Sequence, residues 1–232
     1  MKRPLVLFDI DGTLLASGGA GRRAILATIT RFCEDSTGLN TVRFDGKTDP
    51  QIVVELFEAA GVPNPEEPER VSTVLDHYVS ALEQELAHPA RAAQLMPGIR
   101  ELLNRFDDGA EPVLGLLTGN VRTGATLKLR SAKLDCERFR VGAFGSDHRD
   151  RSELPAIASQ RAMPIFGYAP RGEDIVIIGD TPADMTCGLA LGARAIGVGT
   201  GAYALEELEA AGAWAVFPDL SDVDRVWECI CH

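Results

Sequence analysis

Residues 4–14 read PLVLFDIDGTL, an apolar run that ends in two acids and a turn. Residues 4–10 are short and nearly continuous in hydrophobicity, which is typical of a strand buried on both faces of a parallel sheet. Asp9 and Asp11 lie two residues apart at its end, so in an ideal strand their side chains would point the same way. The segment therefore predicts a core strand that carries two carboxylates to one edge of a sheet.

The same kind of segment recurs along the chain. Apolar runs lie at residues 113–117, 141–144, 175–178 and 195–198. Helical patterns separate them, at residues 99–106, 121–132, 154–162 and 183–191. Alternation of strands and helices indicates a doubly wound, mostly parallel sheet. We therefore expect an α/β fold.

Residues 16–95 contain helical patterns and no convincing buried strand. Helices are expected at residues 22–33 and 50–60, and the strongest helical face carries Val71, Leu75, Tyr78, Val79, Leu82 and Leu86. A hinge is the favoured interpretation of the glycine-rich residues 18–21. The sequence thus predicts an α/β core domain of residues 1–15 and 96–232, with an all-helical cap domain, residues 16–95, inserted in it.

Composition restricts the classes of partner. The formal net charge of −11 argues against general nucleic-acid binding, although one local cation can still hold a small phosphorylated ligand. No apolar run approaches the roughly 20 residues that span a bilayer, and the N-terminal run is too short for a secretory signal, so a cytoplasmic protein is expected. The five cysteines have no regular spacing and are expected to be reduced. Cys229, Cys231 and His232 imitate a metal site, but zinc usually requires four ligands.

Three of the predicted strands end in polar residues. The first leads to Asp9 and Asp11, the next ends in Thr118-Gly119-Asn120, and a later one leads to GDTPAD at residues 179–184. Open parallel sheets bind ligands outside the carboxyl ends of their strands, so these groups should converge at one edge. A solvated strand end with turn-forming Asp and Gly is the alternative for the first motif alone. The coincidence of three such ends favours a site.

The residue types at that edge suit phosphoryl transfer. Asp9 and Asp11 need a cation to remain ionised together, and the oxygen ligands added by Asp180 and Asp184 suit Mg²⁺. A carboxylate that attacks phosphorus forms an aspartyl-phosphate, which water later hydrolyses. A second carboxylate can protonate the leaving oxygen and then activate that water.

This set of motifs resembles that of the haloacid dehalogenase-like (HAD) hydrolase superfamily. The run DIDGTL at residues 9–14 is similar to its first motif, Thr118 to its second and GDTPAD to its fourth. Order and spacing match along essentially the whole chain. The helical stretch is placed like the cap of the phosphoglycolate phosphatase-like branch, which GKTDPQ at residues 46–51 also resembles. The resemblance implies a Rossmann-like core with an inserted helical cap.

The resemblance also implies a role for each matching residue. Asp9 would be the nucleophile and a metal ligand. Asp11 would be the acid and base, and would bind the metal through its carbonyl group. Thr118 would hydrogen-bond the transferring phosphoryl group. Asp180 would bind Mg²⁺, with Asp184 as a second or water-mediated acid.

Substrate contacts are expected from small and polar residues beside these groups. The expected substrate-binding residues are Gly12, Thr13, Gly119, Asn120 and Lys47. The two glycines allow close backbone approach, and their N–H groups are candidates to hold phosphoryl oxygens. Lys47 would meet the distal end of the substrate from the cap, with a solvated surface charge as the alternative.

The third motif of the family is where the sequence departs. The family usually has a Lys before a helix, just ahead of the fourth motif, whereas residues 147–155 read DHRDRSELP. We expect Arg151 to replace it, with Arg149 as the fallback. Arg keeps the charge but replaces a compact ammonium with a planar fork. The alternative is that both are surface charges, and Lys128 and Lys133 on the preceding helical pattern are more distant candidates.

The predicted function is hydrolysis of a small phosphomonoester by a Mg²⁺-dependent phosphatase through an aspartyl-phosphate. A phosphomutase with the same core residues is the nearest alternative, and a non-catalytic phosphometabolite-binding protein is a third. A metal-free dehalogenase is disfavoured because Asp11 is present. The expected partner is a small phosphorylated metabolite, bound by a monomer or a homodimer, with no nucleic acid or membrane involved.

Overall fold

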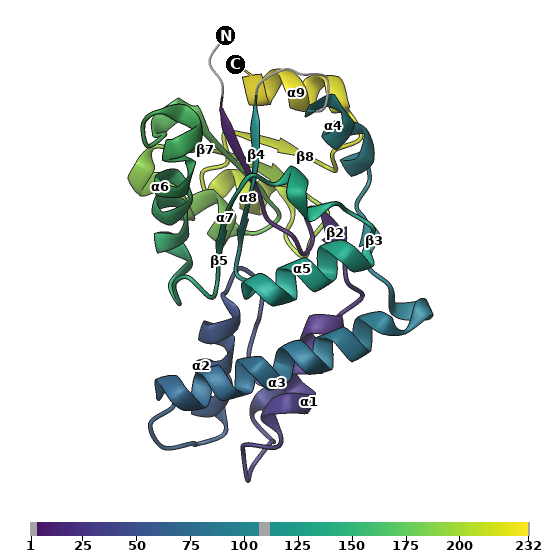
Figure 1. Ribbon diagram of the computed structural model, residues 1–232, viewed down its shortest axis with the longest axis vertical. Helices are drawn as coiled ribbons and strands as arrows, with labels where there is room; N and C mark the ends of the chain where they lie inside the picture. The colour runs from purple at the N-terminus through teal and green to yellow at the C-terminus, as the bar shows by residue number, and fades with distance from the viewer. Residues whose placement is uncertain (1–3, 107–111, 232) are drawn as a thin grey trace.

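The computed structural model describes residues 4–106 and 112–231. Its main sheet has the strand order β5-β4-β1-β6-β7-β8, and each pair of neighbours is parallel (Figure 1). The strands are β1 Leu5–Phe8, β4 Val113–Thr118, β5 Val141–Phe144, β6 Ile175–Gly179, β7 Arg194–Val198 and β8 Ala215–Phe217. The predicted α/β fold with a doubly wound, parallel sheet is confirmed.

Helices cover both faces of this sheet. They are α4 Ile99–Phe106, α5 Arg122–Ser131, α6 Leu154–Phe166, α7 Pro182–Cys187, α8 Leu205–Ala210 and α9 Val223–Cys231. Val6 and Phe8 of β1 pack in one buried cluster with α4, α5 and α9, whereas Leu5 and Leu7 pack in another with α6. Successive strand residues point to opposite sides, so β1 is buried on both faces, as its apolar sequence predicts.

A separate layer of helices lies at the bottom of Figure 1 and is called the cap below. Its helices are α1 Ala20–Ile29, α2 Asp49–Ala59 and α3 Pro68–Ala87. Their buried side chains, with Phe57 and Tyr78 among the largest, form a hydrophobic cluster that also includes Val121 of the core. Helix α5 of the core lies between α3 and the sheet (Figure 1). The helices occur within a few residues of the ranges that the sequence predicts.

The chain enters and leaves the cap through a short antiparallel ribbon. Strand β2 (Leu15–Ala16) pairs with β3 (Gln94–Leu95). Two-residue strands leave no periodic pattern in the sequence. The ribbon lies at the predicted limits of the cap domain, and the division of the chain into two domains stays a prediction.

Two elements end earlier than their sequence patterns. Strand β1 ends at Phe8, so Asp9 and Ile10 lie beyond the strand. The helical pattern of residues 183–191 is divided into α7 and a 3-10 turn, Leu189–Leu191. Gly188 lies between them, where a glycine disfavours a continuous α-helix by roughly 1 kcal/mol relative to alanine.

Two further predictions concern membrane-spanning helices and the state of the cysteines. No helix within residues 4–106 and 112–231 combines the length and the apolar character that crossing a membrane requires. All five cysteines are free thiols. Cys229 and Cys231 lie on α9, whereas His232, the third member of the C-terminal motif, lies outside the described residues.

Candidate active site

The strand order reverses at β1, and the polar strand ends meet there. Strand β1 pairs with β4 on one side and with β6 on the other. Asp9 follows the central strand, Thr118 ends one neighbour and Asp180 follows the other. All three line a cavity of about 700 Å³ that residues of the cap also line. This is the edge at which parallel sheets bind ligands.

Three buried aspartates gather at this edge. Asp9, Asp180 and Asp184 each place a carboxylate oxygen within 4.8 Å of the other two. Burial raises the pKa of Asp9 to about 6, although the guanidinium of Arg151 opposes the rise. Burial and the charges of Asp9 and Asp184 raise the pKa of Asp180 to about 8. Crowded carboxylates that offer only oxygen ligands fit a divalent cation such as Mg²⁺.

The residues after Asp11 pack against Asp180. Thr13 Oγ1 donates to Asp180 Oδ1 at 3.0 Å. Gly12 has a φ of 84°, and a Cβ atom there would collide with the Asp180 carboxylate. Thr200 Oγ1 donates to the Gly12 carbonyl oxygen at 2.5 Å. Gly12 and Thr13 therefore support an acid of the cluster, and their contact with substrate stays a prediction.

Arg151 supplies a cation beside Asp9. It begins a 3-10 turn directly before α6, where Asp150 Oδ1 accepts from the Ser152 N–H at 2.9 Å. Its Nη2 lies 3.4 Å from Asp9 Oδ1 and donates to Asp184 Oδ1. Its Nε is buried and has no partner within residues 4–106 and 112–231. Burial opposes its charge, but the Asp184 and Asp9 carboxylates outweigh burial and raise the pKa of Arg151.

Arg149, the fallback for this role, lies away from the acids. Its guanidinium pairs with Glu66 of the cap at 2.8 Å, and the two side chains are 47% and 61% exposed. Lys133 is exposed beyond the end of α5. The geometry therefore favours Arg151 over both as the cation that faces Asp9.

Asp184 is the most enclosed of the three acids. Its Oδ2 accepts from the Thr181 N–H at 3.0 Å and from Thr181 Oγ1 at 2.6 Å, and these bonds cap the start of α7. Its Oδ1 accepts from Arg151. Both oxygens are engaged, so Asp184 holds Arg151 in place, and its predicted part in binding the metal stays a prediction.

Asp11 has surroundings different from those of Asp9. Because β1 ends at Phe8, strand alternation does not govern the directions of the two side chains. Ser17 Oγ donates to Asp11 Oδ1 at 3.0 Å, and Lys128 Nζ donates to Asp11 Oδ2 at 2.5 Å. Burial acts to raise the pKa of Asp11, but the Lys128 charge and the hydrogen bonds together hold it below its usual value.

Asn120 joins Asp11 to the end of β4. Its Nδ2 donates to Asp11 Oδ2 at 2.9 Å and to Thr118 Oγ1 at 2.8 Å, and its Oδ1 accepts from Lys128 Nζ at 2.6 Å. Thr118 is fully buried, and its hydroxyl also accepts from the Asn120 N–H at 3.3 Å. The structure thus gives Asn120 a part in ordering the site, while its contact with substrate stays a prediction.

The cap reaches the site through the loop before α2. The Asp49 N–H donates to the Gly119 carbonyl oxygen at 2.7 Å, and Asp49 Oδ2 accepts from the Val121 N–H at 2.8 Å. A Cβ atom on Gly119 would collide with the Lys47 carbonyl oxygen, so this cap loop lies against the Gly119 backbone, and the contact of Gly119 with substrate stays a prediction. The Lys47 side chain lines the cavity but pairs with Glu55.

Lys128 belongs to the site, although the sequence pattern ranks it behind both arginines. Its side chain is 5% exposed, and it lines the cavity. The usable signal is its position on α5, where it shares the buried face with Gly124, Ala125 and Leu129. A lysine on an apolar helix face needs a buried partner. Asp49 gives no comparable signal, because an acid in the first turn of a helix is common.

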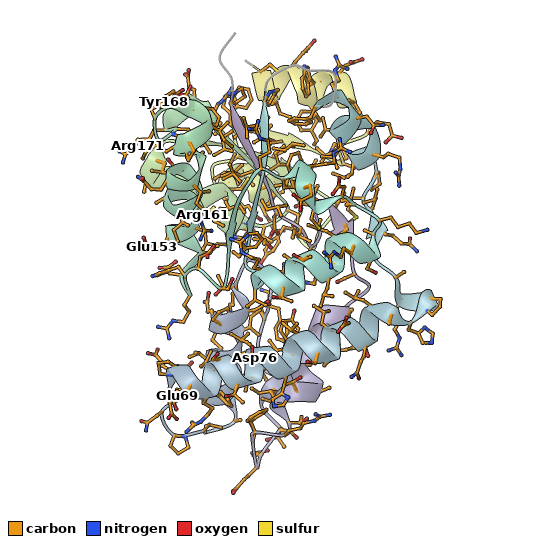
Figure 2. All side chains as sticks on the ribbon, in the orientation of Figure 1. Glu69, Asp76, Glu153, Arg161, Tyr168 and Arg171 are labelled. Carbon is orange, nitrogen blue, oxygen red and sulfur yellow. The ribbon has the colours of Figure 1, made fainter. Side chains whose placement is uncertain are left out.

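Four charged residues on the surface show the contrast with the buried site. Figure 2 labels Glu69 and Asp76 on α3, Glu153 just before α6 and Arg161 on α6, all of which are exposed. None of these side chains lines the cavity in the part of the chain that the structure describes. The candidate site is therefore distinguished by burial as well as by residue type.

Solved structures with a similar fold include a protein in complex with phosphate, a predicted phosphatase and a proposed phosphomutase. CbbY from Rhodobacter sphaeroides, in complex with phosphate, is 19% identical, with a TM-score of 0.70 over 95% of this chain and 96% of that chain. A predicted phosphoglycolate phosphatase from Haemophilus somnus is 16% identical, with a TM-score of 0.72 over 98% and 99%. A proposed β-phosphoglucomutase from Bacteroides vulgatus is 18% identical, with a TM-score of 0.68 over 99% and 89%. At these identities the likeness establishes the fold.

Sequence comparison adds the family. A search of curated proteins finds no match. A family model described as HAD-hydrolase-like matches residues 156–223, and the model of haloacid dehalogenase-like hydrolases matches residues 6–188. The second match runs from β1 through the cap to α7 and includes all the acids of the site. The chain therefore belongs to the haloacid dehalogenase-like hydrolase family.

Proposed function

We propose that the protein is a Mg²⁺-dependent phosphatase that hydrolyses a small phosphomonoester through an aspartyl-phosphate on Asp9. The observation that carries the proposal is the position of the Asp9 carboxylate, which is buried beside Asp180 and lies 3.4 Å from Arg151. A nucleophile between a fixed cation and acids that suit a metal is the arrangement that phosphoryl transfer requires. Family membership supports the hydrolytic class.

In the first step, an Asp9 oxygen forms a bond to phosphorus while the bond from phosphorus to the leaving oxygen breaks. Asp11 gives its proton to the leaving oxygen, which departs as an alcohol. In the free protein the pKa of Asp11 is low, because Lys128 and hydrogen bonds outweigh the effect of burial. The negative charge of a bound phosphate raises that pKa, so Asp11 takes up the proton that it then donates.

In the second step, Asp11 accepts a proton from a water molecule as the water oxygen forms a bond to phosphorus. The bond between phosphorus and Asp9 breaks, which releases inorganic phosphate and restores the carboxylate. Arg151 offers positive charge to the phosphoryl oxygens in both steps. Asp9 and Asp180 would hold Mg²⁺, which would supply further positive charge to the phosphoryl group.

The cavity supports a small phosphorylated metabolite as the substrate. Its volume is about 700 Å³, and cap residues Arg22, Phe44, Lys47 and Tyr78 line the part beyond the acids. The Arg22 guanidinium lies 4.5 Å from the centre of the Phe44 ring, which gives this wall both apolar and cationic character. The phosphate bound to CbbY supports the same ligand class. A cytoplasmic location and a monomeric or homodimeric state stay predictions from the sequence.

A panel of alkyl, sugar and nucleoside phosphomonoesters tests the proposal, assayed for inorganic phosphate with Mg²⁺ and with excess chelator. We expect turnover that requires the metal and falls by at least about 1,000-fold in Asp9→Asn, because an amide does not attack phosphorus. Asp76→Asn, at an exposed position of α3, is the matched control and should keep wild-type turnover. Undiminished turnover in Asp9→Asn or in chelator would contradict the mechanism. A sugar phosphate that isomerises without releasing phosphate would identify a phosphomutase.

A further inference from the structure

Lys128 of α5 places a buried ammonium against Asp11. Its Nζ donates to Asp11 Oδ2 at 2.5 Å and to Asn120 Oδ1 at 2.6 Å. The Lys128 side chain is 5% exposed, whereas that of Asp11 is 38% exposed. The lysine is therefore fixed within the protein and holds a carboxylate that remains accessible from the cavity.

Two further hydrogen bonds hold the Asp11 carboxylate in the orientation that Lys128 favours. Asn120 Nδ2 donates to Asp11 Oδ2 at 2.9 Å, and Ser17 Oγ donates to Asp11 Oδ1 at 3.0 Å. Asn120 is itself held by Lys128 through its amide oxygen. Charge-assisted bonds of this kind are about twice as strong as neutral ones. Removal of Lys128 would release Asp11 directly and would also loosen the asparagine that supports it.

The cap closes over the Lys128 ammonium. A Cβ atom on Gly21 of α1 would lie 3.3 Å from Lys128 Nζ and 3.5 Å from the hydroxyl oxygen of Tyr78 on α3. Tyr78 is 1% exposed, so little water reaches the lysine from that side. The Asp49 carboxylate of α2 is near enough to interact with the same charge. Exclusion of water by three cap helices strengthens the pairing of Lys128 with Asp11.

We propose that Lys128 is a positioning residue for phosphoryl transfer, which orients the Asp11 carboxylate toward the leaving oxygen and then toward the attacking water. This inference rests on the proposed function, in which Asp11 is the acid and base. Lys128 acts through Asp11 and needs no contact with the substrate. Loss of Lys128 should therefore lower kcat more than it changes KM. It should also have no further effect once the Asp11 carboxylate has been removed.

A double-mutant cycle in the full chain, with the best phosphomonoester of the panel and Mg²⁺, tests this role. Lys128→Met keeps the length of the side chain and removes its charge, and we expect kcat to fall about 100-fold with KM changed less than about 3-fold. Asp11→Asn should lower kcat at least as much, and the double variant should match Asp11→Asn within about 3-fold. Lys128→Arg keeps the charge and should recover part of the loss.

Lys133→Met is the matched control, because it makes the same substitution at an exposed position just beyond α5 and should keep the wild-type kcat. Losses that multiply in the double variant would overturn the proposal, as would a rise in KM that explains the whole loss of kcat/KM. If Lys128→Met does not fold, the double variant removes both charges, and its comparison with Asp11→Asn decides the question. Wild-type protein that turns over no member of the panel would instead refute the proposed function.

Discussion

Arg151 is the residue on which the charge balance around Asp9 depends. Its side chain is 7% exposed and lies between Asp184 and Asp9. Both contacts are made by Nη2, which leaves Nε without a partner among the described residues. A lysine at this position would have one nitrogen for all these contacts, whereas the arginine fork has three nitrogens that donate. The departure from the Lys of the third motif therefore preserves the charge and adds a donor.

Arg151→Met should destabilise the protein by about 3–5 kcal/mol, because removal of one partner leaves buried carboxylates uncompensated. Arg149→Met is the matched control, since the pair between Arg149 and Glu66 is exposed and its loss should cost less than about 1 kcal/mol. Urea denaturation at pH 8, without metal, measures both. Equal losses of stability in the two variants would be incompatible with Arg151 as the buried cation.

The first turn of helix α2 is the element that joins the cap to the loops of the core. Thr48 Oγ1 accepts from the Gln51 N–H at 3.2 Å, which caps the helix, and donates to the Arg149 carbonyl oxygen at 2.5 Å. Asp49 binds Gly119 and Val121 after β4. The same turn therefore contacts the loops that follow β4 and β5. Its polar contacts should break together whenever the cap moves away from the core.

Asp49 makes this junction sensitive to pH. Burial raises its pKa to about 6, with the Lys128 charge and the Val121 hydrogen bond opposing the rise. A raised carboxyl pKa means that the folded state binds the proton more tightly than the unfolded chain. Below its unfolded pKa of about 4, Asp49 is protonated in both states and has little effect on stability. Above pH 6 it is ionised in both states, and its destabilising effect on the fold is complete.

Asp49→Asn removes this charge and keeps an oxygen that can accept from Val121. The stability of the variant relative to wild type should rise between pH 4.5 and 7 and reach a gain on the order of 1–3 kcal/mol. Urea denaturation at a series of pH values gives the difference. Asp76→Asn, an exposed aspartate of the same cap, should change stability by less than about 0.5 kcal/mol. A gain for Asp49→Asn that is independent of pH would contradict the assigned cause.

The elements show why some features follow from the sequence and others do not. The core strands are identifiable because burial on both faces leaves apolar runs, as in Leu5–Phe8 and Ile175–Gly179. Strand β8, Ala215–Phe217, is too short and too weakly apolar to form such a run. Asp9 and Asp180 are identifiable because topology alone brings strand ends together. Lys128 carries a weaker signal, because its place on the buried face of α5 indicates a buried partner but does not identify Asp11 and Asn120 as the partners.

Over the whole molecule, the buried positive charge lies at the candidate site, beside a group of buried acids. The sequence carries a formal net charge of −11. Within residues 4–106 and 112–231, the basic side chains that are buried are Lys128 and Arg151, and both line the cavity. Exposed charges such as Glu69 and Asp76 lie on the outer surface (Figure 2). The proposed phosphorylated substrate would therefore meet these two cations at short range, within a protein whose overall field is negative.

The proposed Mg²⁺ site would couple the stability of the whole molecule to the metal. Asp9 and Asp180, with pKa values raised by burial to about 6 and about 8, must lose protons to bind a cation, so Mg²⁺ should stabilise the protein more at pH 8 than at pH 5.5. At about 100 times its Kd, the metal adds about 2.7 kcal/mol, or roughly 5–10 °C in Tm for a chain of this size. Thermal denaturation in MgCl₂, against NaCl of equal ionic strength, measures the shift.

Asp180→Asn is the variant that separates metal binding from general screening. Without Mg²⁺ it should raise Tm at pH 8, because it removes a buried charge that Asp9 and Asp184 repel. In Mg²⁺ it should show no further rise, because it lacks a ligand that the cation needs. The two effects have opposite signs relative to wild type, so a loss of fold in the variant cannot imitate them. An Asp180→Asn protein that Mg²⁺ stabilises as much as wild type would place the cation elsewhere.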